Sequence, residues 1–146
     1  MQARGFTVLE LVVVVGLIGC LAAVAAWRAV AWLPDLRLDA ATRQVMLDLR
    51  LTRGRAMAEQ RYRRLVFDLG HDRYQPQKRE GATYDDDGLP ATLPQGIDLA
   101  DCSAAGAAIS FAPRGTAASF GTLVLRNSLG REKQVVVDIV GRVRVP

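Results

Sequence analysis

Apolar residues run along the first part of the chain with almost no interruption. From Leu11 to Trp27 no residue carries a formal charge. As a helix, the stretch from Phe6 to Leu33 would be about 42 Å long, which exceeds the ~30 Å hydrocarbon core of a bilayer. A secretory signal peptide has a shorter apolar region of roughly 7 to 15 residues, followed by a small-residue cleavage site. The pattern favours a membrane helix over residues 6–33, although its Ala-rich end is a weak match to such a cleavage site.

The residues at the two ends of this helix indicate its orientation. Arg4 is the only charged residue ahead of Phe6, and positive charge favours the cytoplasmic side. Trp27 and Trp32 lie near the far end, where aromatic rings prefer the membrane interface and Arg28 can extend its charge outward. We expect a single-pass protein with a cytoplasmic N-terminus and a C-terminal domain outside the membrane.

Beyond Pro34 the helical pattern continues, now on one face only. Apolar or small residues recur at steps of three and four, at Leu38, Ala41, Val45, Leu49, Thr52 and Ala56. The pattern predicts one helix from Phe6 to Gln60, kinked near Pro34 because proline removes a backbone N–H. Asp35 leaves open the alternative of a break with a fresh helix start.

The rest of the chain is typical of β-strands. Short β-rich runs bounded by turn residues predict strands and hairpins, over 64–69 and 73–75, 108–111, and 120–126 and 133–140. The segment 80–95, rich in Gly, Pro and Asp, is the best loop candidate. We predict an α+β fold in which a long N-terminal helix, half membrane-spanning and half amphipathic, packs on a C-terminal antiparallel sheet.

Length and composition limit the remainder to one small domain, residues 34–146. This part has 17 Lys and Arg against 14 Asp and Glu, a net charge of +3, which permits weak contact with anionic polymers without requiring it. Cys20 lies in the membrane run and Cys102 in the domain, so the domain must fold without an internal disulfide. We expect Cys102 to be a small buried residue, with an intermolecular bridge as the alternative.

No group of residues points to catalysis. His71 is the only histidine and lies in a predicted turn, which argues against a metal site or a Ser–His pair. The run Asp85, Asp86, Asp87 and Gly88 lacks the spacing and the distal Glu of a calcium loop. The sequence therefore predicts a non-enzyme with no cofactor and no metal.

Glu10 is an exception to the apolar pattern, because it stands at the start of the membrane run. A charge inside hydrocarbon costs roughly 2.5 to 3.5 kcal/mol, so an acid there suggests a functional site with a partner charge. The alternative is that Glu10 lies at the headgroups and is solvated.

The segment GFTVLE, with a basic leader before it and a long apolar helix after it, closely resembles the class III signal of type IV pilins and type II secretion pseudopilins. The resemblance implies a leader of residues 1–5, cut after Gly5 by a prepilin peptidase, and methylation of the new N-terminal Phe6. The partners would be other pilins or pseudopilins, in a filament extracted from the inner membrane. In a staggered filament Glu10 could then pair with the Phe6 ammonium of a neighbouring subunit.

The last 35 residues or so, FAPRGTAASFGTLVLRNSLGREKQVVVDIVGRVRV, resemble the C-terminal part of the GspH/FimT subgroup of that family. Arg142 and Arg144 alternate with valines, so on a strand they would share one face. With Arg114, Arg126 and Arg131 nearby they could form a phosphate-binding strip. A similar tail in the FimT branch is implicated in DNA binding. The alternative is that these charges protect an exposed strand edge from aggregation.

Two functions follow from the resemblance. The first is a minor pseudopilin, a structural subunit of a periplasmic filament that drives protein export across the outer membrane. The second is a FimT-like minor pilin of a type IV pilus that binds DNA through Arg142 and Arg144 for pilus assembly or natural transformation.

Overall fold

The structure, a computed structural model, describes the backbone of residues 7–146 and the side chains of that range except at 26–31. It divides into two compact units, Met1–Leu33 and Pro34–Pro146, and we describe each by itself. The predicted cleavage and methylation residues, Gly5 and Phe6, lie outside the described residues.

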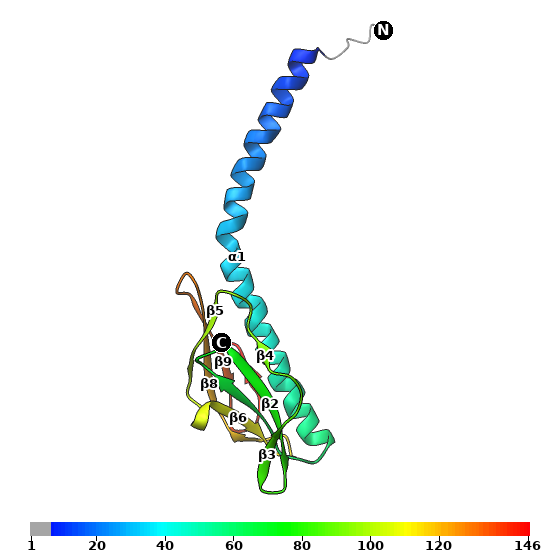
Figure 1. The fold of residues 1–146 in the computed structure, drawn as a ribbon, viewed down its shortest axis with the longest axis vertical. Coiled ribbons are helices and arrows are strands. Elements are labelled where there is room, and N and C mark those ends of the chain that lie inside the picture. The colour runs from blue at the N-terminus through cyan, green and yellow to red at the C-terminus, as the bar shows by residue number, and fades with distance from the viewer. Residues whose placement is uncertain (1–6) are drawn as a thin grey trace. The chain divides into compact units, whose positions relative to one another are not determined.

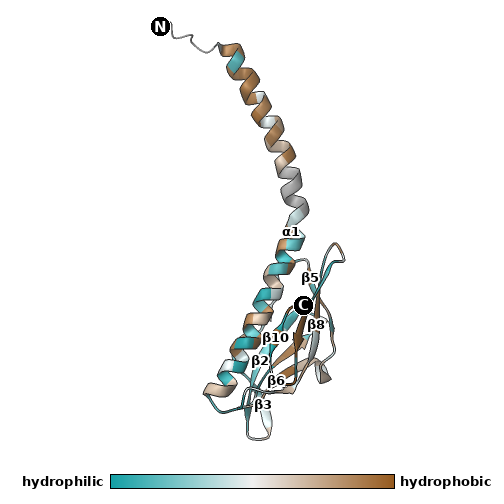
Figure 2. Cartoon of the chain, turned by 180° about the vertical axis from the view of Figure 1, so that it is seen from behind, coloured by the Kyte–Doolittle hydropathy of each residue, from teal (hydrophilic) through white to brown (hydrophobic). Residues whose placement is uncertain are grey.

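Helix α1, Val8–Ala58, supplies the described part of the first unit and continues into the second. Within the described residues it contains one window apolar enough to span a membrane, Val8–Ala25, with mean hydropathy 2.7 and no buried residue. Figure 2 shows this part mostly in brown, whereas teal residues recur throughout the later part of the helix. The helix runs through Pro34 without ending, so the alternative of a fresh start at Asp35 is wrong.

The strands of the second unit form two antiparallel sheets, where the sequence suggested one. The first sheet has the order β3-β2-β1-β6-β7, with β4 also pairing with β2, and the second has the order β10-β9-β8-β5. Their bounds are β1 Arg63–Asp68, β2 Arg73–Glu80, β3 Thr83–Asp86, β4 Ala91–Thr92, β5 Ile97–Cys102, β6 Ala108–Phe111, β7 Ala117–Ser119, β8 Gly121–Asn127, β9 Glu132–Val137 and β10 Val143–Arg144, with a 3-10 turn at Ala105–Ala107. The cyan-to-green part of α1 lies along these strands (Figure 1).

The predicted loop 80–95 is wrong in part, because it contains β3 and β4. Glu80 pairs with Thr83, which leaves a two-residue hairpin turn in which Gly81 has a φ of 63°. Most side chains of β3 are exposed, so this edge strand lacks the alternation of apolar residues that would mark it in the sequence.

The last predicted strand, 133–140, is also too long. Strand β9 ends at Val137, and the Gly141 N–H donates to the Asp138 carbonyl at 2.8 Å, which closes a turn over residues 138–141. Gly141 has a φ of 80°, a conformation that glycine adopts without steric cost. The apolar residues Ile139 and Val140 hid this turn from the sequence pattern.

The core of the second unit lies between α1 and the sheets. The predicted helical row is buried, since Leu38, Val45 and Leu49 are at most 2% exposed. Burial of one such side chain stabilises the fold by roughly 1.5–3 kcal/mol. The row faces buried sheet residues that include Leu65, Phe67, Ile109, Phe111, Leu123, Leu125, Val135 and Val137.

Two polar contacts join α1 to the first sheet. The hydroxyl of buried Tyr74 on β2 donates to the carboxylate of Asp48 on α1, and burial raises the pKa of Tyr74 well above its usual value. Just after the helix end, the buried Arg63 guanidinium on β1 pairs with Glu59, the residue that follows α1, at 2.5 Å and with Asp87. These contacts hold the second half of the helix in a fixed rotation, with one face toward the core.

Candidate functional site

Glu10 lies in the first turn of α1 and is exposed. Its backbone N–H donates to Thr7 Oγ1 at 3.2 Å, so Thr7 acts as the N-cap and Glu10 occupies the third helical position. A Thr-x-x-Glu sequence is the signature of a capping box, and an acid in the first turn also favours the helix dipole. Sequence reasoning missed this local role, although the four letters TVLE show it.

The face of α1 opposite the core carries large apolar residues that the second unit leaves exposed. Leu36, Leu47 and Leu51 are 62%, 58% and 52% exposed. Leu47 follows the buried Val45 by two positions, a rotation of roughly 200° around the helix. We call Leu36, Leu47 and Leu51 the outer leucine row. Its spacings of eleven and four residues are the sequence signal. The more regular row of buried residues on the opposite face obscured this signal.

The C-terminal tail has the alternation that the sequence predicts. Val143 is 6% exposed, and the residues on either side of it, Arg142 and Arg144, are exposed. Val143 and Arg144 form β10, which pairs with Val137 and Val136 of β9. Arg142 is bound locally, because its backbone N–H donates to Asp138 Oδ1 at 2.8 Å and its Nε lies 3.8 Å from Asp138 Oδ2.

Two glycines hold this tail against the 112–116 turn. Gly115 and Gly141 have φ values of 83° and 80°, and a Cβ on Gly141 would overlap the Gly115 carbonyl oxygen. The same oxygen accepts a hydrogen bond from Arg53 Nε on α1 at 2.7 Å. The close approach therefore brings the backbone next to Arg114 close to the backbone next to Arg142.

The other two arginines of the predicted strip do not join them. Arg126 pairs with Glu132 at 2.6 Å and Arg131 with Asp35 at 2.5 Å, both at the β8–β9 hairpin. Arg144 pairs with Val136 on β9, five residues from Arg131 and so roughly 17 Å along the strand. The structure thus gives a shorter basic strip than the sequence suggested.

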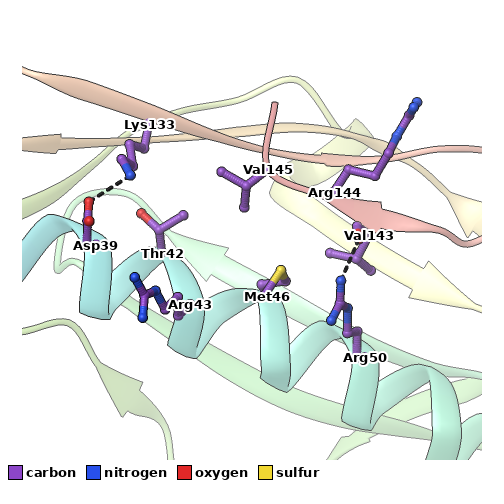
Figure 3. A pocket seen from close by; sticks show the side chains of 9 residues that line it. All are labelled: Asp39, Thr42, Arg43, Met46, Arg50, Lys133, Val143, Arg144 and Val145. Carbon is purple, nitrogen blue, oxygen red and sulfur yellow. Dashed lines mark hydrogen bonds and ion pairs between the residues drawn. The ribbon is translucent and has the colours of Figure 1, made fainter.

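A groove of about 530 Å³ lies between α1 and the ends of β9 and β10 (Figure 3). Arg50 Nη2 donates to the Val143 carbonyl at 3.2 Å, and Lys133 Nζ lies 2.7 Å from Asp39 Oδ1. The hydrogen bond from Lys133 lowers the pKa of Asp39. The lining residues are Asp39, Thr42, Arg43, Met46, Arg50, Lys133, Val143, Arg144 and Val145.

The remaining reactive groups have local partners. Asp87 of the acidic run binds Arg63, which lowers the pKa of Asp87, and His71 Nδ1 lies 2.9 Å from Asp68 Oδ2. Cys102 is half-buried, and this burial raises the pKa of its thiol. No group of three or more potential metal ligands occurs in the part of the chain that the structure describes.

Residues 41–141 match the family model of the type II transport protein GspH. The chain belongs to the GspH family. The matched range covers most of the buried row of α1, the strands from β1 to β9 and the close approach of the two glycines, whereas β10 lies just outside it. Members of this family are structural subunits, and the chain has the role of a minor pseudopilin or a minor pilin. It is not an enzyme. No curated protein matches the sequence.

Solved structures share the GspH-family fold at low identity. Two structures of the minor pseudopilin EpsH from the type II secretion system of Vibrio cholerae are 13% and 14% identical to the chain, with TM-scores of 0.63 and 0.65. They cover 75% and 77% of this chain and 96% and 94% of theirs. The type IV minor pilin FimU of Pseudomonas aeruginosa is 13% identical, with a TM-score of 0.55, over 75% of this chain and 87% of its own.

These likenesses confirm the predicted fold class, a long helix packed on antiparallel strands in a pilin-like α+β fold. The apolar start of α1 fits a single-pass membrane anchor in such a protein. FimU, from a type IV pilus, and EpsH, from a secretion system, share this fold, so the fold does not distinguish the two systems.

Proposed function

We propose that this protein is a minor pseudopilin, a structural subunit of the type II secretion filament that drives protein export across the outer membrane. The family model supports the secretion system, since it describes a type II transport protein. The outer leucine row supports assembly, since it offers an apolar helix face that the domain leaves uncovered.

The outer leucine row carries this proposal. Three leucines on one helical face, each more than half exposed, form the kind of apolar surface that marks a protein interaction site. Each would add roughly 25 cal/mol per Å² of apolar area that a neighbouring subunit covers. The row recurs with helical spacing, which suits packing against the helix of a neighbour.

Processing would prepare the chain for this assembly. A prepilin peptidase would remove residues 1–5 and leave Phe6 as a methylated N-terminus in the inner membrane, with the domain of residues 34–146 in the periplasm. Glu10 would then pair with the Phe6 ammonium of the next subunit, which lowers the cost of an acid near hydrocarbon. Thr7 capping is compatible with this role, because it uses the backbone N–H of Glu10 and leaves its carboxylate available.

Complementation of a strain that lacks the gene tests the proposal. The wild-type chain should restore release of exported proteins into the medium, and Leu47→Asp should not, because a carboxylate in the outer leucine row opposes packing. Leu129→Asp is the matched control, since Leu129 is 59% exposed on the β8–β9 hairpin. Normal export by the Leu47 variant would contradict assembly through this row.

A FimT-like minor pilin that binds DNA is the second candidate. The exposure of Arg142 and Arg144 on either side of buried Val143 favours it. A double Arg142→Gln, Arg144→Gln variant should then bind duplex DNA more weakly and with a salt slope smaller by about 2. Unchanged affinity and slope, together with normal export in the complementation assay, would leave the pseudopilin role alone.

A further inference from the structure

The groove between α1 and β10 has more positive than negative side chains. One carboxylate, that of Asp39, lines the groove. The four cationic residues that line it are Arg43, Arg50, Lys133 and Arg144. The imbalance is local, since the whole unit from Pro34 onward has a net charge of only +3.

Two of the four cations are engaged within the protein. Lys133 pairs with Asp39, and Arg50 binds the Val143 carbonyl. Arg43 and Arg144 are exposed, and neither forms a side-chain hydrogen bond or ion pair with a residue that the structure describes. In Figure 3 Arg43 lies on the helix side of the groove, and the Arg144 side chain extends from the strand side, away from α1. Arg43 is therefore the unengaged guanidinium of the groove itself, and Arg144 carries a second one at its outer rim.

The floor of the groove is apolar. Met46, Val143 and Val145 line it, and Val145 is 37% exposed. From Asp39 to Arg50 the helix rises about 16 Å, which is the length of roughly five residues of extended chain. The groove thus matches a short extended segment that has both apolar and anionic groups.

Recognition here would rest on side chains and not on strand addition. The Val143 carbonyl points to the helix, where Arg50 Nη2 occupies it. This bond blocks the free edge of β10 at the position where an added strand would pair. Arginine is suited to the alternative, since its planar fork binds carboxylates with two hydrogen bonds.

We propose that this groove binds an extended segment of another protein, in which carboxylates alternate with apolar side chains. Arg43 binds a carboxylate within the groove and Arg144 binds a second one at the rim, and Met46 and Val145 contact the apolar groups. Nucleic acid fits less well, because protein–DNA interfaces are more polar than this floor and use many cations for phosphates. The inference concerns binding alone and does not depend on the role in a filament.

A binding assay with the full-length protein in non-ionic detergent tests this proposal. The probe is a fluorescein-labelled peptide of alternating glutamate and valine, five residues long, and the readout is its anisotropy. Arg43→Gln should weaken binding about tenfold and Arg144→Gln at least about threefold, since each removes a charge-assisted hydrogen bond. A peptide with glutamine in place of glutamate should bind the wild-type protein no more tightly than the glutamate peptide binds the Arg43 variant.

Arg37→Gln is the matched control. Arg37 is an exposed arginine on the same helix, six residues before Arg43 and so about 120° away around the axis. Its loss should change the affinity less than twofold, and thermal unfolding by circular dichroism should be unchanged in all three variants.

Three outcomes would overturn the proposal. An equal loss of affinity for Arg37→Gln would show attraction by net charge alone. Displacement of the peptide by duplex DNA, with DNA affinity lowered in the Arg43 and Arg144 variants, would assign the groove to nucleic acid. Concentration-dependent self-association that Arg43→Gln abolishes would assign it to a second copy of the chain.

Discussion

The inner and outer faces of α1 beyond Pro34 present the same residue type in opposite settings. Leu38 and Leu49 face the sheets and are at most 2% exposed, whereas Leu47 and Leu51 are more than half exposed. All four lie on one continuous helix, so helix propensity does not distinguish them. The inner face stabilises the domain, and we infer that the outer face is available for assembly.

The largest effect on stability should come from the inner face. Leu49→Ala removes a fully buried side chain and should destabilise the protein by about 2–5 kcal/mol, because a cavity remains in the core. Leu51→Ala is the matched control two positions away and should change stability by less than about 0.5 kcal/mol. Denaturant unfolding in detergent measures both, and equal losses would contradict the assignment of the two faces.

The next effect concerns the close approach of Gly141 to Gly115, whose carbonyl also accepts a hydrogen bond from Arg53 on α1. Gly141→Ala should cost about 2–4 kcal/mol, since a Cβ would overlap the Gly115 carbonyl at a positive φ. Gly130→Ala is the control, because Gly130 also has a positive φ of 78° but meets no atom within 4 Å. A Gly141 variant no less stable than the Gly130 variant would show that the close approach can relax.

A smaller effect depends on pH and involves Asp87, which pairs with Arg63 near the end of α1. The hydrogen bond from Arg63 lowers the pKa of Asp87 in the folded protein, so its contribution to stability is present above the unfolded pKa of about 3.9 and is lost as the pH falls through the folded value. Thermal stability should therefore be nearly constant from pH 7 to about pH 5 and fall at lower pH.

Asp87→Asn tests that assignment. It should lower the stability at pH 7 by about 1–2 kcal/mol, because Glu59 still pairs with the buried Arg63. The decrease on acidification should be smaller than in the wild type, and Asp98→Asn, at an exposed carboxylate, should leave the curve unchanged. A full acid-induced loss in the Asp87 variant would assign the pH dependence to other carboxylates.

The sequence predicts the inner face of α1 better than it predicts the strands or the groove. A row such as Leu38, Val45 and Leu49 is visible because helix period and burial coincide. Strand β3 is not visible, because an exposed edge strand needs no apolar alternation. The groove could not be predicted at all, since it joins residues near 43, 133 and 144 whose proximity depends on how the second sheet packs against the helix.

The smallest effect on stability belongs to the start of the helix, where the capping role of Glu10 can be separated from its proposed role in assembly. Glutamine can replace glutamate in a capping box, so Glu10→Gln should preserve the helix start and remove only the charge. If the carboxylate pairs with the Phe6 ammonium of a neighbour, both Glu10→Gln and Glu10→Ala should reduce incorporation into the filament, measured by cross-linking in cells. If Glu10 acts only through the cap, the glutamine variant should assemble at the wild-type level and the alanine variant should not. The difference between these two variants therefore separates a contact between subunits from a contact within one helix.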